Sequence, residues 1–157
     1  MADENVKVLL TGGGTGGHIY PAIVIADEIR RLNPSAQILF VGTRRGLESK
    51  VVPRLGYEIK YIDVRFIIRR LTLKNFVTVY KALTSAFAAK KIIREFKPDI
   101  VVGTGGYVSG PVVYAATRLK VPTLIHEQNA FPGLTTRLLS RRVTKVAVSH
   151  AAAVKRL

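Results

Sequence analysis

A histidine that follows a glycine-rich segment is the first candidate for chemistry in this sequence. Residues 12–17 read Gly-Gly-Gly-Thr-Gly-Gly, and His18 comes directly after them. Glycines lack the Cβ atoms that would hold a ligand away from the backbone, and the N–H groups at a helix start attract an anion. Because histidine gains or loses a proton near neutral pH, the segment predicts an anion-binding loop with an acid–base residue at its edge.

Two further segments place polar or glycine residues after apolar runs. The first is Thr104-Gly105-Gly106-Tyr107-Val108-Ser109-Gly110, which follows the apolar residues 100–103. The second is His126-Glu127-Gln128-Asn129, which follows the apolar run that begins at residue 122. Both are typical of loops at the end of a buried strand, so we expect them to contribute to the same site.

The spacing of apolar residues predicts alternating strands and helices. Strands are expected at 5–11, 37–41, 57–62, 100–103, 122–126 and 145–148, and helices at 19–32, 47–54, 72–96, 110–119 and 133–140, with residues 151–157 as a short helix or a frayed end. This alternation predicts an α/β, Rossmann-like parallel sheet with helices on both faces and the strand order 3-2-1-4-5-6. Ligands of such sheets bind where the order reverses, between strands one and four, and the three segments above meet there.

Length and composition exclude several classes of protein. The chain has 157 residues, which suits one domain with a sizeable core, and it contains no cysteine, which excludes disulfides and thiolate metal sites. We find no His, Asp and Glu cluster with metal-ligand spacing and therefore expect no metal site. The start is acidic and polar, and no apolar run approaches the ~18 residues of a membrane span. We therefore expect a cytoplasmic chain that does not span a membrane.

The positive charge is unevenly distributed. The net charge is +15, but residues 1–64 carry only +1, whereas residues 65–97 carry +8 and residues 118–157 carry +7. Such a field implies an anionic partner, unless it is a solvated face that serves solubility. Nucleic acid is not expected, because the sequence lacks an aromatic-rich basic motif and a recognition-helix pattern.

The strongest local signal for that partner is the segment 65–81. Leu71, Leu73, Phe76, Val77 and Tyr80 fall on one side of the predicted long helix, and Arg69, Arg70 and Lys74 lie among them. An apolar patch with a basic rim predicts binding to anionic membrane lipids. The alternative is that these apolar residues belong to the core.

The glycine loop alone leaves a dinucleotide-binding role open. Gly12, Gly14 and Gly17 satisfy the G-x-G-x-x-G fingerprint. No carboxylate ends the second predicted strand, but Arg44 and Arg45 follow it and suit a 2′-phosphate. An NADP-binding domain of an oxidoreductase is therefore one alternative.

Three motifs taken together support a different reading. Gly-Gly-Thr-Gly-Gly-His at 13–18, Gly-Gly-Tyr-Val-Ser-Gly-Pro at 105–111 and His-Glu-Gln-Asn at 126–129 resemble, in order and spacing, the N-terminal half of the MurG family of bacterial GlcNAc transferases. The resemblance implies one half of an inverting GT-B glycosyltransferase that converts lipid I to lipid II in peptidoglycan synthesis, at the cytoplasmic face of the inner membrane.

The resemblance also implies what this half binds. Residues 1–157 would form one domain that binds lipid I and the membrane and is inactive alone, without a cofactor of its own. UDP-GlcNAc would bind only with a C-terminal donor-binding domain, which is absent here. A membrane-recruiting subunit of a split glycosyltransferase is a further alternative.

The candidate site residues divide into three groups. His18 is the leading general base, with a pKa that we expect the helix dipole to lower, and Glu127 is the rival base. The expected acceptor and diphosphate contacts are Gly13, Gly14, Thr15, Gly16, Gly17, Gly105, Gly106, Tyr107 and Ser109. Asn129 and Gln128 are expected on the donor-sugar side, and His126 is expected to orient its neighbours.

Overall fold

Six parallel strands form the centre of the molecule. The computed structural model describes residues 5–64 and 74–157, with side chains from residue 84 onward in the second range. The strands are β1 (Lys7–Thr11), β2 (Gln37–Gly42), β3 (Glu58–Tyr61), β4 (Ile100–Gly103), β5 (Thr123–Glu127) and β6 (Lys145–Val148). Their order is β3-β2-β1-β4-β5-β6, as the sequence predicts, and every adjacent pair is parallel.

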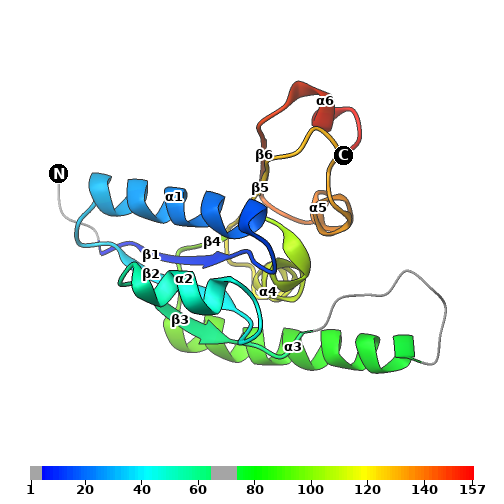
Figure 1. Ribbon diagram of the computed structural model, residues 1–157, viewed down its shortest axis with the longest axis horizontal. Coiled ribbons are helices and arrows are strands. Elements are labelled where there is room, and N and C mark those ends of the chain that lie inside the picture. Colours follow the sequence, from blue (N-terminus) through cyan, green and yellow to red (C-terminus); the bar gives the residue numbers. More distant parts are fainter. Residues whose placement is uncertain (1–4, 65–73) are drawn as a thin grey trace.

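Helices connect the strands and cover both faces of the sheet (Figure 1). They are α1 (Gly16–Leu32), α2 (Glu48–Arg54), α3 (Lys74–Phe96), α4 (Gly106–Arg118), α5 (Leu134–Leu139) and α6 (Ala151–Val154). Buried residues of α1 and α2 form one apolar core with the sheet, and buried residues of α3, α4 and α5 form the other. The fold is therefore a three-layer α/β domain of the predicted class.

The strand sequences explain why both faces are covered. Side chains alternate between the two faces of a strand, so Val8 and Leu10 enter one core while Leu9 enters the other. Phe40 and Val41 of β2 divide between the two cores in the same way. Strands that are apolar at every position are stable only where helices exclude water on both sides, and this is the arrangement that the connecting helices provide.

Two helices begin earlier than the sequence predicts. α1 starts at Gly16 rather than near residue 19, and α4 starts at Gly106 rather than near residue 110. Glycine is a poor helix former, so the sequence pattern excluded the glycines from these helices. In the structure they form the first turns, which places the ends of both glycine loops on helix N-termini. The residues 151–157 contain the short helix α6.

We predict that the cores, rather than exposed aromatic residues, determine stability. Phe40 is 1% exposed and its ring centroid lies 5.3 Å from that of Tyr57. Phe40→Ala should therefore lower the free energy of unfolding by about 3–5 kcal/mol, measured by urea denaturation. Phe87→Ala removes the same atoms from a residue that is 72% exposed and should change it by less than about 0.5 kcal/mol. Equal effects of the two variants would contradict this assignment of the core.

Candidate functional site

The candidate site lies where the strand order reverses. β1 pairs with β2 on one side and with β4 on the other, so the connections after β1 and β4 leave in opposite directions along the sheet. The Thr104 N–H donates to the Thr11 carbonyl (2.9 Å), which joins the two strand ends where the loops begin. The loop after β5 reaches the same place, because the Gln128 amide donates to the Gly17 carbonyl (2.8 Å). The three predicted segments therefore meet.

The two glycine loops touch through their backbones. A Cβ on Gly106 would overlap the Gly13 carbonyl oxygen, and Gly106 has a positive φ of 81°. Gly14 also has a positive φ, of 85°, and a Cβ there would lie 2.6 Å from a ring carbon of Tyr107. Side chains at these positions would separate the loops or strain the backbone. The glycines therefore allow the ends of β1 and β4 to approach closely.

The first turn of α1 offers backbone N–H groups to a ligand. Thr15 is the N-cap residue, but its hydroxyl makes no capping hydrogen bond. Among the described residues, the amides of Thr15, Gly16 and Gly17 have no hydrogen-bond acceptor, whereas those of His18 and Ile19 donate to the Thr15 carbonyl (both 3.2 Å). The first turn carries no acidic side chain. This geometry is suited to an anion such as a phosphate.

His18 is held from two sides. Its Nδ1 lies 2.9 Å from the Thr15 hydroxyl, and a Cβ on Gly105 would lie 2.7 Å from its Cδ2, so the ring packs against that glycine. Its Nε2 has no hydrogen-bond partner in the described part of the chain. When Nδ1 carries the proton and donates to Thr15, Nε2 is free to accept a proton from a bound hydroxyl.

The pKa of His18 is lowered, in the direction that the sequence predicts but for a different main reason. Burial of the ring disfavours the charged imidazolium and lowers the pKa, while the negative charge of Glu127 raises it by a smaller amount. The expected cause was the helix dipole, whereas desolvation is the largest effect. The lowered pKa favours the neutral imidazole, which is the form that can accept a proton.

Glu127 is a structural carboxylate, which counts against its role as the rival base. One oxygen, Oε1, accepts the Asn129 N–H (3.0 Å) and side-chain amide (2.9 Å). The other, Oε2, accepts the Gly133 N–H (3.0 Å) and the Thr136 hydroxyl (2.7 Å). Burial raises the pKa of Glu127. The hydrogen bonds stabilise the ionised form and together lower the pKa by more than burial raises it, so the net shift is downward. A carboxylate with both oxygens occupied orders the β5–α5 loop.

The other residues of the β5–α5 loop have separate partners. Asn129 is exposed and tied to Glu127, and Gln128 bridges to α1, while its Oε1 atom is buried without a partner among the described residues. The Nε2 atom of His126 lies 3.2 Å from the hydroxyl of Ser149, the residue that follows β6. Gln128 and Asn129 thus border the site, and His126 packs beside it.

The second glycine loop differs from expectation at Ser109. Ser109 is 2% exposed and its hydroxyl donates to the Gly106 carbonyl (3.1 Å) within the first turn of α4. The structure gives no support to the predicted contact of Ser109 with the acceptor substrate, because the first turn of α4 directs its side chain into the core. Tyr107 is half-buried against Gly14, and Gly105 lies against the His18 ring. These residues remain at the site.

Two residues that the sequence analysis did not count among the site residues, Glu48 and Thr104, hold the glycine loops in place. Glu48 accepts the Gly14 N–H (2.9 Å), so this amide is not available to a ligand. The Thr104 hydroxyl donates to the His18 carbonyl (2.6 Å) and occupies the space that a Cβ on Gly12 would need. The available signals were a lone acidic residue shortly after the second strand and a threonine directly before Gly105. Neither signal identifies its distant partner.

Arg44 and Arg45 give no support to the dinucleotide alternative. The Arg44 guanidinium lies over the Tyr61 ring at 4.8 Å, at the end of β3, and Arg45 is exposed. The carboxylate near β2, Glu48, faces the glycine loop with both oxygens occupied and so cannot bind a ribose hydroxyl. Within residues 5–64 and 74–157, no group of His, Asp and Glu side chains could hold a metal ion.

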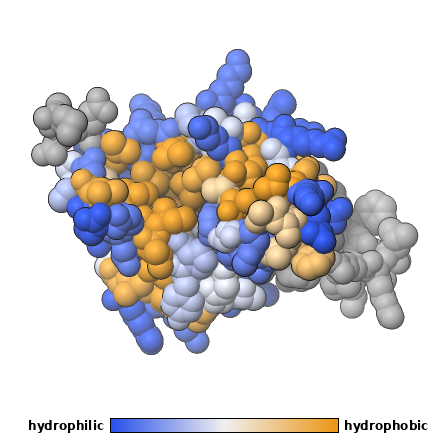
Figure 2. Space-filling view, turned by 90° about the horizontal axis from the view of Figure 1, so that it is seen from above, coloured by the Kyte–Doolittle hydropathy of each residue, from blue (hydrophilic) through white to orange (hydrophobic). Residues whose placement is uncertain are grey.

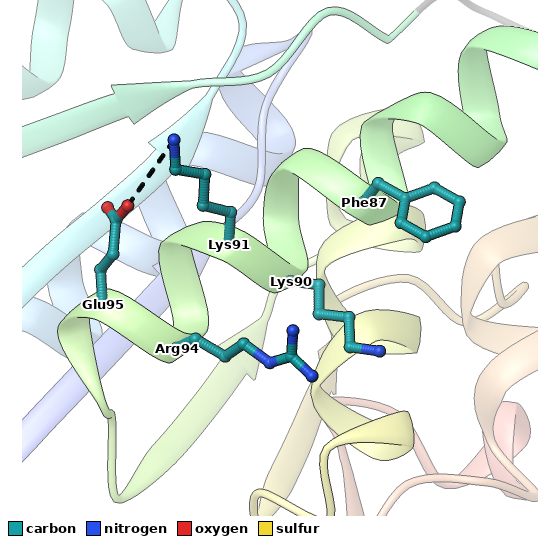
Figure 3. A pocket seen from close by; sticks show the side chains of 5 residues that line it. All are labelled: Phe87, Lys90, Lys91, Arg94 and Glu95. Atoms are coloured by element: carbon teal, nitrogen blue, oxygen red, sulfur yellow. Dashed lines mark ion pairs between the residues drawn. The ribbon is translucent and has the colours of Figure 1, made fainter.

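The predicted membrane-binding residues lie outside the part of the chain whose side chains the structure describes. Residues 69–71 and 73 lie outside the described residues, and the side chains of residues 74–80 are not described either. The nearest described part of α3 carries a shallow surface hollow lined by Phe87, Lys90, Lys91, Arg94 and Glu95 (Figure 3). It shares no residue with the candidate site. In the described part of the chain, no helix is long and apolar enough to cross a membrane.

The fold and the site together define a Rossmann-like domain of the GT-B glycosyltransferase type. The model of the glycosyltransferase family 28 N-terminal domain matches residues 8–148. The chain belongs to this family. The relatives and the solved structure described next confirm the predicted resemblance to the N-terminal half of the MurG family.

Individual relatives support the same assignment. A protein of Thermoanaerobacter sp. (strain X514), named UDP-N-acetylglucosamine--N-acetylmuramyl-(pentapeptide) pyrophosphoryl-undecaprenol N-acetylglucosamine transferase, is 57% identical over 150 residues, which are 96% of this chain and 41% of the relative. A Lactococcus lactis protein of the same name is 50% identical over 148 residues, 94% of this chain and 42% of its own length. The chain therefore spans less than half the length of the curated relatives it matches.

Solved structures agree with the sequence comparison. The crystal structure of Acinetobacter baumannii MurG superposes with a TM-score of 0.82 at 33% identity, over 94% of this chain and 42% of that one. A putative UDP-N-acetylglucosamine 2-epimerase from Listeria monocytogenes gives a TM-score of 0.66 at 14% identity, over 99% of this chain and 42% of that one, which shows the fold alone.

We predict that burial and Glu127 have opposite effects on His18. An NMR titration of the imidazole should give a pKa below 6.5, because burial dominates. Glu127→Gln should lower this pKa further, since it removes the charge that raises it. Glu58→Gln removes an exposed charge on β3 and should leave the pKa unchanged. A pKa at or above 6.5 in the unmodified chain would contradict the role of burial.

Proposed function

We propose that this chain is the acceptor-binding half of an enzyme that transfers GlcNAc from UDP-GlcNAc to lipid I and forms lipid II. The observation that carries this proposal is the His18–Thr15 pair, which lies at the start of α1 between two glycine loops in contact. Relatives at 50–57% identity carry the name of this transferase. The lipid-linked diphosphate of the acceptor is an anion of the kind that the open amides of α1 attract.

In this mechanism His18 is the general base. The hydroxyl oxygen of the acceptor sugar forms a bond to the anomeric carbon of GlcNAc, the bond from that carbon to UDP breaks, and the hydroxyl proton goes to His18 Nε2. A lowered pKa keeps Nε2 unprotonated at neutral pH. Thr15 holds the ring through Nδ1, and Glu127 positions the loop on the opposite side of the site.

The amides of Thr15, Gly16 and Gly17 would contact the diphosphate of the acceptor, with Gly13, Gly14, Gly105 and Gly106 allowing it to approach the backbone. Tyr107 would border the acceptor, since its ring packs on Gly14. Gln128 and Asn129 would face the donor sugar, because they lie at the edge of the site on the β5–α5 loop.

Transfer requires a second domain that binds UDP-GlcNAc, and this requirement is also part of the proposal. Large apolar side chains near the site support a covering partner: Phe131 is 71% exposed on the β5–α5 loop, and Leu134 and Val154 are exposed on α5 and α6. Figure 2 shows the face on the side of α1 and α6, where apolar side chains gather between charged ones. Whether that domain is part of the same polypeptide or a separate subunit distinguishes the leading proposal from a split enzyme.

An anionic membrane is the second proposed partner. Phe87 is 72% exposed on α3, and Lys90 and Arg94 beside it make no ion pair among the described residues (Figure 3). The sequence segment that contains Arg69, Arg70 and Lys74 is also apolar and basic. Phe87, Lys90 and Arg94 continue this composition further along the chain, toward the C-terminal end of α3. A peripheral position at the cytoplasmic face of the bacterial inner membrane follows from this proposal.

We predict that His18→Ala acts on turnover. This chain, fused to or mixed with the donor-binding domain of a relative, should form lipid II from UDP-GlcNAc and a short-chain lipid I analogue, and this chain alone should not. In the active combination, His18→Ala should lower kcat about 10²–10⁴-fold with little change in KM. His126→Ala is the matched control and should lower kcat much less, since it removes an imidazole whose Nε2 lies against the Ser149 hydroxyl. A changed KM with unchanged kcat would contradict the base, and lipid II formed by the chain alone would contradict the half-enzyme.

We predict that α3 contributes to membrane binding in two separable ways. Lys90→Glu with Arg94→Glu should weaken sedimentation with phosphatidylglycerol vesicles most at low salt, because each cation contributes about 1 kcal/mol that salt screens. Phe87→Ser should weaken it at all salt concentrations, because it removes apolar burial. Phe131→Ser, which changes an exposed phenylalanine elsewhere, should have no effect. Unchanged binding of the α3 variants would exclude this surface.

A further inference from the structure

Glu48 is a buried carboxylate that the proposed reaction does not use. It lies in the first turn of α2, is 1% exposed, and has no cation among its partners in the described residues. Its Oε2 accepts the Gly14 N–H (2.9 Å), and its Oε1 accepts both the N–H (2.9 Å) and the hydroxyl (2.8 Å) of Thr43. One carboxylate therefore joins the β1–α1 loop to the β2–α2 loop.

The surrounding backbone is shaped to this side chain. A Cβ on Gly13 would lie 2.5 Å from the carboxyl carbon of Glu48, and a Cβ on Gly42 would lie 2.5 Å from its Cγ. A Cβ on Gly46 would overlap the carboxylate, and the Gly46 N–H donates to the Thr43 hydroxyl (3.1 Å). Three glycines, one in the β1–α1 loop, one at the end of β2 and one in the β2–α2 loop, thus enclose a single carboxylate. Burying a charge is costly unless donors satisfy it, and here three donors do so.

The position of Gly14 determines which amides face the site. Its N–H points to Glu48, while the amides of Thr15, Gly16 and Gly17 have no acceptor among the described residues. Since the Thr15 hydroxyl meets His18 Nδ1, a shift of Gly14 would also move the residue that orients the imidazole. Glu48 therefore acts on the ligand-binding amides and on His18 through the loop.

We propose that Glu48 is a positioning residue that fixes the β1–α1 loop in the form that binds the acceptor diphosphate. The proposal rests on the function proposed above and adds a residue to it. The negative charge of Glu48 also repels a diphosphate. Positioning of the loop therefore raises the affinity for the diphosphate, while charge repulsion lowers it. The three donors point their dipoles at the carboxylate and weaken its field at the site, so we take the geometric effect as the larger one.

The variant Glu48→Gln tests the geometry with little change of shape. A glutamine keeps one carbonyl oxygen, which satisfies the two donors of Thr43, and then presents its NH₂ group to the Gly14 N–H. In this orientation, which keeps both bonds from Thr43, two donors face each other at Gly14, so the Gly14 N–H loses its acceptor and is no longer held. We expect the affinity for a short-chain lipid I analogue, measured by calorimetry on this chain, to fall at least about tenfold. Hydrogen exchange of the Gly14 amide should become at least about tenfold faster.

Two matched variants separate this effect from a general loss of stability. Thr43→Val removes one bond to Oε1 and the acceptor of the Gly46 N–H but leaves Oε2 on Gly14, so Gly14 exchange and ligand affinity should change less than twofold. Glu58→Gln removes an exposed carboxylate from β3 and should change neither quantity. In the unmodified chain, Gly14 should exchange more slowly than Gly16 and Gly17, and this measurement holds even if Glu48→Gln does not fold.

The possible outcomes distinguish this proposal from the proposed function. Binding of the analogue by Glu48→Gln that is equal to or tighter than that of the unmodified chain would overturn the positioning role. Tighter binding would mean that charge repulsion by Glu48 dominates. Fast exchange of the Gly14 amide in the unmodified chain would also overturn it. If the unmodified chain does not bind the analogue, the proposed function fails and the ligand part of this proposal fails with it. Slow Gly14 exchange would still support the hold of Glu48 on the loop in that case.

Discussion

The close approach of two glycine loops is the constraint on which the rest of the site depends. Gly106 lies against the Gly13 carbonyl, Gly105 against the His18 ring, and Gly12 against the Thr104 hydroxyl. These contacts are possible because β1 and β4 are neighbours in the sheet and end at the same level. With larger side chains at these positions, the strands could still pair, but the helices that follow could not begin so close together. The helix N-termini and the imidazole therefore share one small space.

Two buried carboxylates hold the loops that surround this space. Glu48 binds the loops after β1 and β2, and Glu127 binds the loop after β5. Each side chain accepts backbone N–H groups and a threonine hydroxyl, and among the described residues neither has a basic hydrogen-bonding partner. The negative charges of Glu48 and Glu127 are therefore stabilised by hydrogen bonds within the domain. The amides at the start of α1 remain open to an anionic ligand, in a chain of net charge +15.

The sequence predicted the architecture well because the fold depends on repeated local patterns. Continuous apolar strands alternate with amphipathic helices, and the right-handed crossover rule then restricts the strand order, which the structure confirms. The errors fell at the starts of α1 and α4, where glycines form the first turns against their intrinsic preference. Tertiary contacts between the two loops outweigh that preference.

The sequence by itself determined the residue types at the site: a histidine after five glycines, a second glycine loop, and His-Glu-Gln-Asn after a strand. Only the tertiary structure decided what each of them does. It turned Ser109 into the core, used both oxygens of Glu127 to order a loop, and brought Glu48 to Gly14, 34 positions away in the chain. Hydrogen-bond partners and burial depend on distances between segments remote in sequence, and no local pattern of residues encodes those distances.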